Sequence, residues 1–295
     1  MYSIKRPCKM TTTSFDLTLL QQWVGKTEMT TRRIDANQVA ALVATLDRAQ
    51  VLTDGMVLPP LWHWIFFWDA APQAALGIDG HPQRGGFLPP VPLPRRMWAG
   101  GRLQFLAPLP IGATAIRTSR VESVGAKEGK SGTLAFVTVE HRIAVDGAAA
   151  IIEQHDIVYR DNPRPGAMAP AGKPAPAQAA WSRLITPDPV LLFRYSALTF
   201  NGHRIHYDRS YVTEVEGYPG LIVHGPLIAT LLLDLLYRNV PDAQVARFDF
   251  RAVGPLFDTQ PFTVCGQPAD DGRSIALWAK DHQGALAMQA EVTLA

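Results

Sequence analysis

The most constraining feature of the sequence is the repetition of one order of elements. In each half of the chain, a stretch with no polar face precedes several segments in which apolar and polar residues alternate. A helix that is apolar all round is buried, and alternation with a period of two indicates strands with one buried face. Each half therefore predicts a central helix covered by antiparallel strands.

The first half shows this order once. The sequence DANQVAALVATLDRA (35–49) predicts a helix with Asp35 as its N-cap. The aromatic-rich run 58–77 predicts a second helix in the core, and the Gly- and Pro-rich segment 80–101 predicts a long loop. From residue 102 onward, alternation predicts four strands at 103–110, 113–124, 133–145 and 149–160.

The second half repeats the order after a break in composition. Residues 162–180 are rich in Pro, Ala and Gly, which interrupt helices and central strands. We therefore predict an N-terminal domain at 1–160, a linker at 161–180 and a C-terminal domain at 181–295. The second domain predicts an apolar helix at about 226–238, then strands at 246–253, 260–267, 274–281 and 285–295.

These patterns predict an α+β protein with a tandem, or double, hot-dog fold, in which antiparallel sheets are each wrapped around a central helix. The two halves are also weakly similar residue by residue. The sequences RLQFLAPLP from Arg102 and RFDFRAVGP from Arg247 share Arg, Phe and Ala at matching offsets. This similarity indicates an internal pseudo-twofold arrangement.

Composition argues against several classes of protein. A formal net charge of +2 does not indicate a nucleic-acid binder. Cys8 and Cys265 are far apart in sequence, which argues against a disulfide framework or a zinc site and fits a reducing compartment. The chain shows no secretory signal and no apolar run long enough to cross a bilayer. We therefore expect a cytoplasmic protein that does not bind membranes.

A polar segment precedes the most apolar helix. The sequence RYSALTFNGHRIHYD resembles the signature of the MaoC-like, or type-2, enoyl-CoA hydratases. The residues that fit this signature are Tyr195, Ser196, Ile205, His206 and Asp208. The later VHG (223–225) resembles the family's glycine at the start of the hot-dog helix.

Two positions depart from the family pattern. Where the family has aspartate and proline, this chain has Asn201 and Arg204. With the RRMWAGG stretch (95–101), these departures resemble one subgroup. It contains the mesaconyl-C4-CoA and itaconyl-CoA hydratases of bacteria and is related to the mitochondrial 3-hydroxyacyl-thioester dehydratases.

Adding water to an enoyl thioester requires a base, an acid and donors for the enolate oxygen. His206 is the expected base, because its intrinsic pKa lies near working pH. Asn201 can orient water but cannot accept its proton. Either His206 carries both proton transfers or a carboxylate assists, and the candidates are Asp208, Asp69 and Asp79. By resemblance and by its place at a helix start, Gly225 is assigned as the N–H donor to the enolate.

Arginines and aromatic residues form the predicted substrate-binding set. Arg204 suits a second carboxylate on the acyl group, or it forms an ion pair with Asp208 or Glu214. Arg95 and Arg96 are rival anchors for that carboxylate or for coenzyme A phosphates, or they are a solvated pair. Trp98 or Phe87 closes over the acyl chain, and Tyr218 completes the set.

The remaining histidines are expected to be structural. His63 and His203 belong to this group, and His224 is expected to cap or pack the helix start. His81 is also placed here, although its GHP sequence stands where it can reach the site. No metal, flavin or nucleotide cofactor is expected, because the sequence shows no ligand cluster, GxGxxG motif or P-loop.

The resemblance implies an acyl-CoA hydratase/dehydratase with one active site per chain. The C-terminal domain carries the hydratase motif, and the N-terminal domain is expected to be a non-catalytic wall of the acyl tunnel. The expected substrate is a branched dicarboxylic enoyl-CoA, either itaconyl-CoA or mesaconyl-C4-CoA, which gives citramalyl-CoA. Coenzyme A enters only as part of that substrate, and a homo-oligomer is compatible with the sequence. The alternatives are a 3-hydroxyacyl-thioester dehydratase of fatty-acid synthesis, a hot-dog thioesterase and a non-catalytic acyl-CoA binder.

Overall fold

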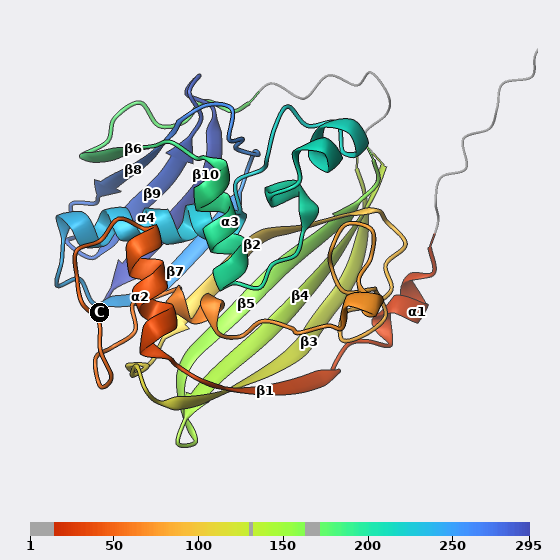
Figure 1. The fold of residues 1–295 in the computed structure, drawn as a ribbon, viewed down its shortest axis with the longest axis horizontal. Coiled ribbons are helices and arrows are strands. Elements are labelled where there is room, and N and C mark those ends of the chain that lie inside the picture. The colour runs from red at the N-terminus through yellow and green to blue at the C-terminus, as the bar shows by residue number, and fades with distance from the viewer. Residues whose placement is uncertain (1–14, 130–131, 163–171) are drawn as a thin grey trace, which may run out of the picture.

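The computed structural model describes residues 15–129, 132–162 and 172–295. Ten strands form one antiparallel sheet in the order β1-β3-β4-β5-β2-β7-β10-β9-β8-β6 (Figure 1). Residues 163–171 of the predicted linker, and Cys8, lie outside the described residues. The strands are β1 (Thr27–Arg33), β2 (Arg95–Phe105), β3 (Thr114–Gly129), β4 (Gly132–Val145), β5 (Ala148–Arg160), β6 (Trp181–Ile185), β7 (Val245–Ala252), β8 (Phe262–Pro268), β9 (Ser274–Lys280) and β10 (Leu286–Leu294).

The two halves meet at the centre of the sheet, where β2 pairs with β7 and Leu103 lies opposite Phe248. Outward from this pair, the strand order is the same on both sides: β5, β4, β3 and β1 on one, and β10, β9, β8 and β6 on the other. The two similar sequences from Arg102 and Arg247 therefore form the central pair. This arrangement is the tandem hot-dog fold.

Helices cover the inner face of the second half of the sheet (Figure 1). The central helix α4 (Gly225–Asn239) packs against β6, β8, β9 and β10, and it is buried continuously from Leu227 to Leu236. Its apolar circumference explains this position, because no side of the helix faces water. Helix α2 (Ala36–Thr45), capped by Asp35 as predicted, packs against α3 (Pro189–Leu198).

The long helix predicted at 58–77 is wrong. This segment forms only two short 3₁₀ helices, η1 (Trp62–Ile65) and η2 (Gln73–Ala75). Pro59 and Pro60 precede η1, and Leu61 has a left-handed backbone with φ of 71°, which an α-helix does not accommodate. The aromatic run is nevertheless in the core, as predicted, with Trp62, Ile65, Phe66 and Phe67 all buried. The first half of the sheet therefore has no central helix among its described residues.

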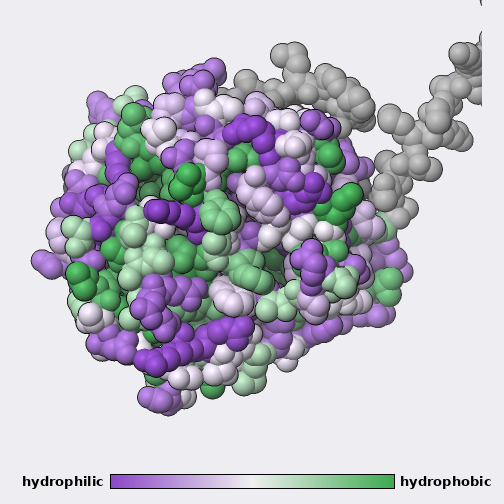
Figure 2. Space-filling model, viewed as in Figure 1, coloured by the Kyte–Doolittle hydropathy of each residue, from purple (hydrophilic) through white to green (hydrophobic). Residues whose placement is uncertain are grey.

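Several boundaries also differ from the prediction. Strand β2 begins at Arg95, so the RRMWAGG stretch is strand and not loop. The edge strands β1 and β6 were not predicted, nor were α3 and the short helix α1 (Leu17–Gln21). No described helix is long and apolar enough to cross a membrane. Figure 2 shows polar and apolar residues intermingled on the face seen in Figure 1.

Candidate functional site

A large cavity of about 1900 Å³ occupies the inner face of the first half of the sheet and extends to the polar segment 199–208. Alternate residues of β5 line it, at positions 153, 155, 157 and 159. The cavity exceeds the about 300–1,000 Å³ of most small-molecule sites. It lies on the sheet face that has no central helix, so the missing helix leaves room for a ligand.

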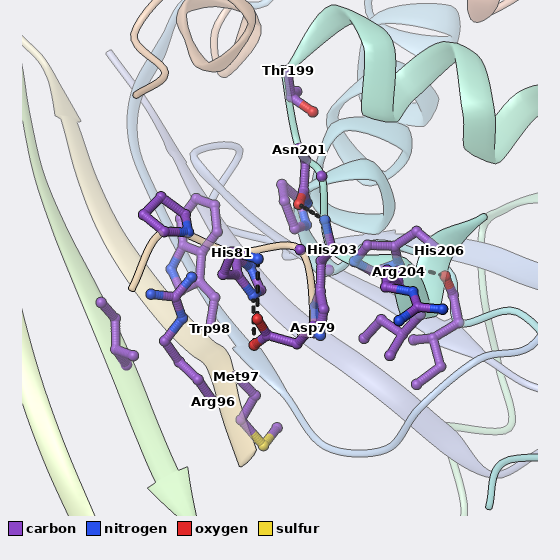
Figure 3. Close-up of a pocket in the computed structure, with 18 of the residues that line it drawn as sticks. Asp79, His81, Arg96, Met97, Trp98, Thr199, Asn201, His203, Arg204 and His206 are labelled. Carbon is purple, nitrogen blue, oxygen red and sulfur yellow. Dashed lines mark hydrogen bonds and ion pairs between the residues drawn. The ribbon is translucent and has the colours of Figure 1, made fainter. Parts of the chain in front are cut away.

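His206 lies on the cavity wall in the short 3₁₀ helix η3 (Arg204–His206) (Figure 3). Its Nδ1 is 2.7 Å from the carbonyl oxygen of Ile222 and donates to it, because a carbonyl can only accept. In the neutral ring, Nε2 therefore carries the lone pair. Burial lowers the pKa of His206 to about 4, although the bond to Ile222 opposes this shift. His206 is thus an uncharged base at neutral pH.

The ring of His224 packs against the ring of His206. The two rings stack with centroids 3.7 Å apart and planes 17° apart. His224 is fully buried and its Nε2 lies 2.8 Å from Ser196 Oγ. Burial holds the pKa of His224 well below its usual range, and the charge of His206 would lower it further. The predicted packing role of His224 at the start of α4 agrees with this position, since it is the N-cap residue.

Gly225 is the first residue of α4 and lines the cavity directly after His224. No side chain caps this end of the helix. Pro226 follows and has no N–H, so the free donors at this end belong to its neighbours. A Cβ at Gly225 would meet only the Trp98 carbonyl oxygen, at 4.0 Å. The helix start is therefore open to an approaching oxygen, beside the His206–His224 stack.

Asn201 also lines the cavity. Its Oδ1 accepts the backbone N–H of His203 at 3.0 Å, and its own N–H donates to the Ser196 carbonyl at 2.8 Å. The Oδ1 bond orients the amide of Asn201 and uses one of the two lone pairs of Oδ1. Asn201 is thus brought together with His206 and Gly225, as the sequence predicts.

A loop from the first half docks onto this segment. The backbone N–H of Arg204 donates to the Asp79 carbonyl at 2.9 Å, and Arg204 Nη1 donates to the Ile78 carbonyl at 3.1 Å. Gly80 has φ of +87°, and a Cβ there would lie 1.9 Å from the Gly202 carbonyl oxygen. Only glycine fits this contact. Asp79, one of the distant sequence candidates, is thereby placed at the site, whereas Asp208 is engaged elsewhere.

Asp79, His81 and His203 form a cluster at the loop contact (Figure 3). Asp79 Oδ2 lies 3.3 Å from His81 Nδ1, and the rings of His81 and His203 are 4.1 Å apart. Burial alone raises the pKa of Asp79, but the hydrogen bonds and charge of His81 outweigh it and lower the pKa. These three side chains offer ligand atoms within 4.8 Å of one another, so among the described residues they are the set that could hold a metal ion.

The four predicted binding residues around the cavity differ in what they contact. Arg95 forms an ion pair with Glu216 at 3.3 Å and donates to the Tyr218 hydroxyl at 2.6 Å, so these two predicted residues lie together. Arg96 lies opposite Tyr159 in the β2–β5 ladder, lines the cavity and has no carboxylate partner among the described residues. The indole of Trp98 packs against the ring of His155, 3.9 Å away.

Arg204 forms an ion pair with Asp208, which the sequence predicted as the alternative to binding a substrate carboxylate. Its guanidinium meets Asp208 at 2.7 Å and lies over the Tyr211 ring, 4.2 Å from the centroid. These contacts occupy most of its donors. A role for Arg204 in binding substrate stays a prediction, and Arg96 is the better placed of the two cations.

A second polar cluster in the cavity was missed. Glu153 is buried on β5 and accepts from Trp64 Nε1 at 2.7 Å, with His63 Nε2 also 2.7 Å away. His155 contacts the same carboxylate. His141 continues the network, 3.3 Å from His155. The signal was present in the sequence, because Glu153 and His155 share the parity of Ile151 and Tyr159, which are core positions.

The chain is similar to known proteins over most of its length. A family model described as hydroxyacyl-thioester dehydratase type 2 matches residues 61–258. The mesaconyl-C(4)-CoA hydratase of Chloroflexus aurantiacus is 48% identical over 92% of this chain and 96% of its own length. The mitochondrial hydroxyacyl-thioester dehydratase type 2 of Schizosaccharomyces pombe is 31% identical over 70% of this chain and 77% of its own.

A solved structure supports the fold alone. A Mycobacterium tuberculosis protein described as having a double hotdog fold superposes with a TM-score of 0.56 at 14% identity, over 92% of this chain and 96% of that one.

Proposed function

Because the chain belongs to the hydroxyacyl-thioester dehydratase type 2 family, we propose that it is an acyl-CoA hydratase. Its preferred substrate is a branched dicarboxylic enoyl-CoA, mesaconyl-C4-CoA or itaconyl-CoA, and its product is citramalyl-CoA. The observation that carries this proposal is the placement of a neutral His206 beside the open start of α4 in one cavity. The 48% identity to a mesaconyl-C(4)-CoA hydratase supports the acyl group.

We propose a task for each group of the site. His206 Nε2 takes a proton from water as the water oxygen attacks Cβ. The thioester oxygen gains negative charge and lies at the start of α4, where the Gly225 N–H and the positive helix end stabilise it. The acyl group extends into the part of the cavity that lies on the first half of the sheet. We infer one site per chain, with no cofactor beyond the coenzyme A of the substrate.

The direct test is an assay of purified protein with mesaconyl-C4-CoA, itaconyl-CoA and crotonyl-CoA, following loss of the enoyl absorbance. We expect rapid hydration of a dicarboxylic ester and slow hydration of crotonyl-CoA. Citramalyl-CoA should appear as the product by mass spectrometry. If all three esters remain intact while the protein is folded, the proposal is wrong.

A second candidate is the dehydration of a 3-hydroxyacyl thioester of fatty-acid synthesis. The family description and the Schizosaccharomyces pombe relative favour it. It uses the same groups in reverse, so His206 does not separate the two. A preference for long unbranched 3-hydroxyacyl thioesters over citramalyl-CoA would select this candidate.

Arg96 provides a test of the dicarboxylic substrate. Arg96 lines the cavity, opposite Tyr159 in the β2–β5 ladder, and has no carboxylate partner among the described residues. Its guanidinium there suits the free carboxylate of the acyl group. We expect Arg96→Met to lower kcat/KM for the dicarboxylic ester by about 10–100-fold, the loss of one charged hydrogen bond of about 1.5–3 kcal/mol. The value for crotonyl-CoA should change little.

The matched control for this measurement is Arg251→Met. Arg251 is an exposed arginine on β7. This substitution should leave kcat/KM unchanged for both esters. Equal losses for both esters in Arg96→Met would instead place Arg96 at a part of the substrate that the two esters share.

A further inference from the structure

The site has one histidine base but a water molecule has two hydrogens to place. His206 Nε2 can accept one of them. The Oδ1 of Asn201 already uses one of its two lone pairs on the His203 N–H. A second acceptor facing the attacking water would fix its direction, and the carboxylates of Asp208 and Glu216 are already paired with Arg204 and Arg95.

The docked loop brings a candidate to the same place. His81 follows Gly80, whose close contact with Gly202 fixes the loop against the His206 segment. The loop is closed on itself by the Gly77 N–H, which donates to the His81 carbonyl at 2.7 Å. The His81 ring lies beside His203, and His203 in turn packs edge-on to His206 with centroids 5.5 Å apart. Figure 3 shows Asp79 and His81 directed at one another across the pocket from β2.

Asp79 fixes the state of His81. One carboxylate oxygen accepts the His81 backbone N–H at 3.0 Å, and the other lies 3.3 Å from Nδ1. A carboxylate accepts only, so Nδ1 carries the hydrogen and Nε2 carries the lone pair. The pairing has the form of the Asp–His units that orient an imidazole for proton chemistry.

We propose that His81, held by Asp79, is a further catalytic residue of the hydratase reaction and accepts the second hydrogen of the attacking water. The proposal rests on the proposed function, because it concerns the same reaction. The catalytic site is then completed by both halves of the chain. His206 belongs to the second half, and the Asp79–His81 pair belongs to the first.

The proton balance is simple. One O–H bond of water breaks and its proton moves to His206 Nε2, while the new C–O bond forms at Cβ and the C=C electrons become the enolate. The enolate carbon Cα then takes that proton from His206. The other hydrogen stays on the product hydroxyl throughout, hydrogen-bonded to His81 Nε2. No oxidant, reductant or additional proton is required.

The electrostatics of the cluster support the accepting role. Burial lowers the pKa of His81, the charge of Arg96 lowers it further, and Asp79 opposes both. His81 is therefore neutral at pH 7, as an acceptor must be. Burial also lowers the pKa of the intervening His203, so no imidazolium repels the proton that moves to His206.

The test compares His81→Ala and Asp79→Asn with wild type on the best dicarboxylic ester. We expect His81→Ala to lower kcat by about 100-fold, the usual cost of a misplaced reacting group, while KM changes by less than about threefold. Asp79→Asn should lower kcat by about tenfold or more, and the double variant should match His81→Ala, because groups that act as a unit are not additive. Asp270→Asn, in an exposed turn, is the matched control.

Three results would overturn the inference. The first is wild-type kcat in His81→Ala. The second is a loss that appears only in KM or in thermal stability. The third is activity that EDTA removes and a divalent cation restores, since the same three side chains would then be metal ligands. Wild type inactive on every ester would instead reject the proposed function itself, so the two failures are distinguishable.

Discussion

Replacing His206 with alanine is expected to lower kcat/KM for hydration by about 10²–10⁴-fold, the usual contribution of a positioned general base. Among the described residues, His206 is the histidine beside the start of α4 whose Nδ1 donates to a backbone carbonyl and leaves Nε2 as a base. The variant should stay folded, because His224 keeps its bond to Ser196. Steady-state kinetics measured together with a thermal melt test both statements.

The matched control is His282→Ala, in the exposed turn between β9 and β10, which should be fully active. The pH profile of kcat/KM adds a second reading. Burial lowers the pKa of His206 to about 4. Activity should therefore persist well below pH 6.5 and fall only as the pH approaches the pKa of about 4. An acid limb centred near pH 6.5 would contradict a buried base.

Replacing Glu153 with glutamine is expected to lower the free energy of unfolding by about 3–5 kcal/mol, as when one partner of a buried charged network is removed. Glu153 is 1% exposed and three donor side chains meet its carboxylate, from His63, Trp64 and His155. A glutamine offers one acceptor oxygen to these donors. Urea unfolding at pH 7 measures the loss, and Glu291→Gln, at an exposed position of β10, is the control.

The sign of the pH dependence follows from the same network. Burial alone raises the pKa of Glu153, but the charges and hydrogen bonds of His155 and His63 outweigh it and hold the pKa well below 4.5. The contribution to stability is therefore complete above the unfolded value and is lost as pH falls through the folded one. The difference between wild type and Glu153→Gln should shrink in acid. A constant difference from pH 7 to pH 3 would contradict this assignment.

The second half of the chain was predictable because its patterns are long and regular. The helix predicted at 226–238 is α4, and its four strands appear within a few residues of their predicted ends. In the first half, the helix predicted at 58–77 is wrong because an apolar run indicates that a segment is buried but does not indicate which secondary structure it forms. The edge strands were missed because TEMTTRR in β1 is polar, and WSRLI in β6 is only five residues long.

The candidate site was predictable only where its residues are close in sequence. His206, Asn201 and Gly225 lie within 25 positions of one another, and a signature connects them. Asp79 and His81 come from a loop more than 100 residues earlier, and the Gly80–Gly202 contact and the hydrogen bonds of Arg204 to this loop bring them in. No periodic pattern encodes such a contact, so His81 was assigned a structural role.

The central strand β2 limits how this architecture can diversify. Residues 100–104 are paired along both edges, with β5 and with β7, and a bulge between Trp98 and Gly100 precedes them. A Cβ on Gly100 would lie 2.6 Å from the Phe250 carbonyl oxygen, so the register is locked there. One inserted residue before this point would turn Arg96 and Trp98 to the opposite face. Proteins that evolve from this chain are therefore expected to change their substrates by exchanging side chains in β2, while the length of β2 stays constant.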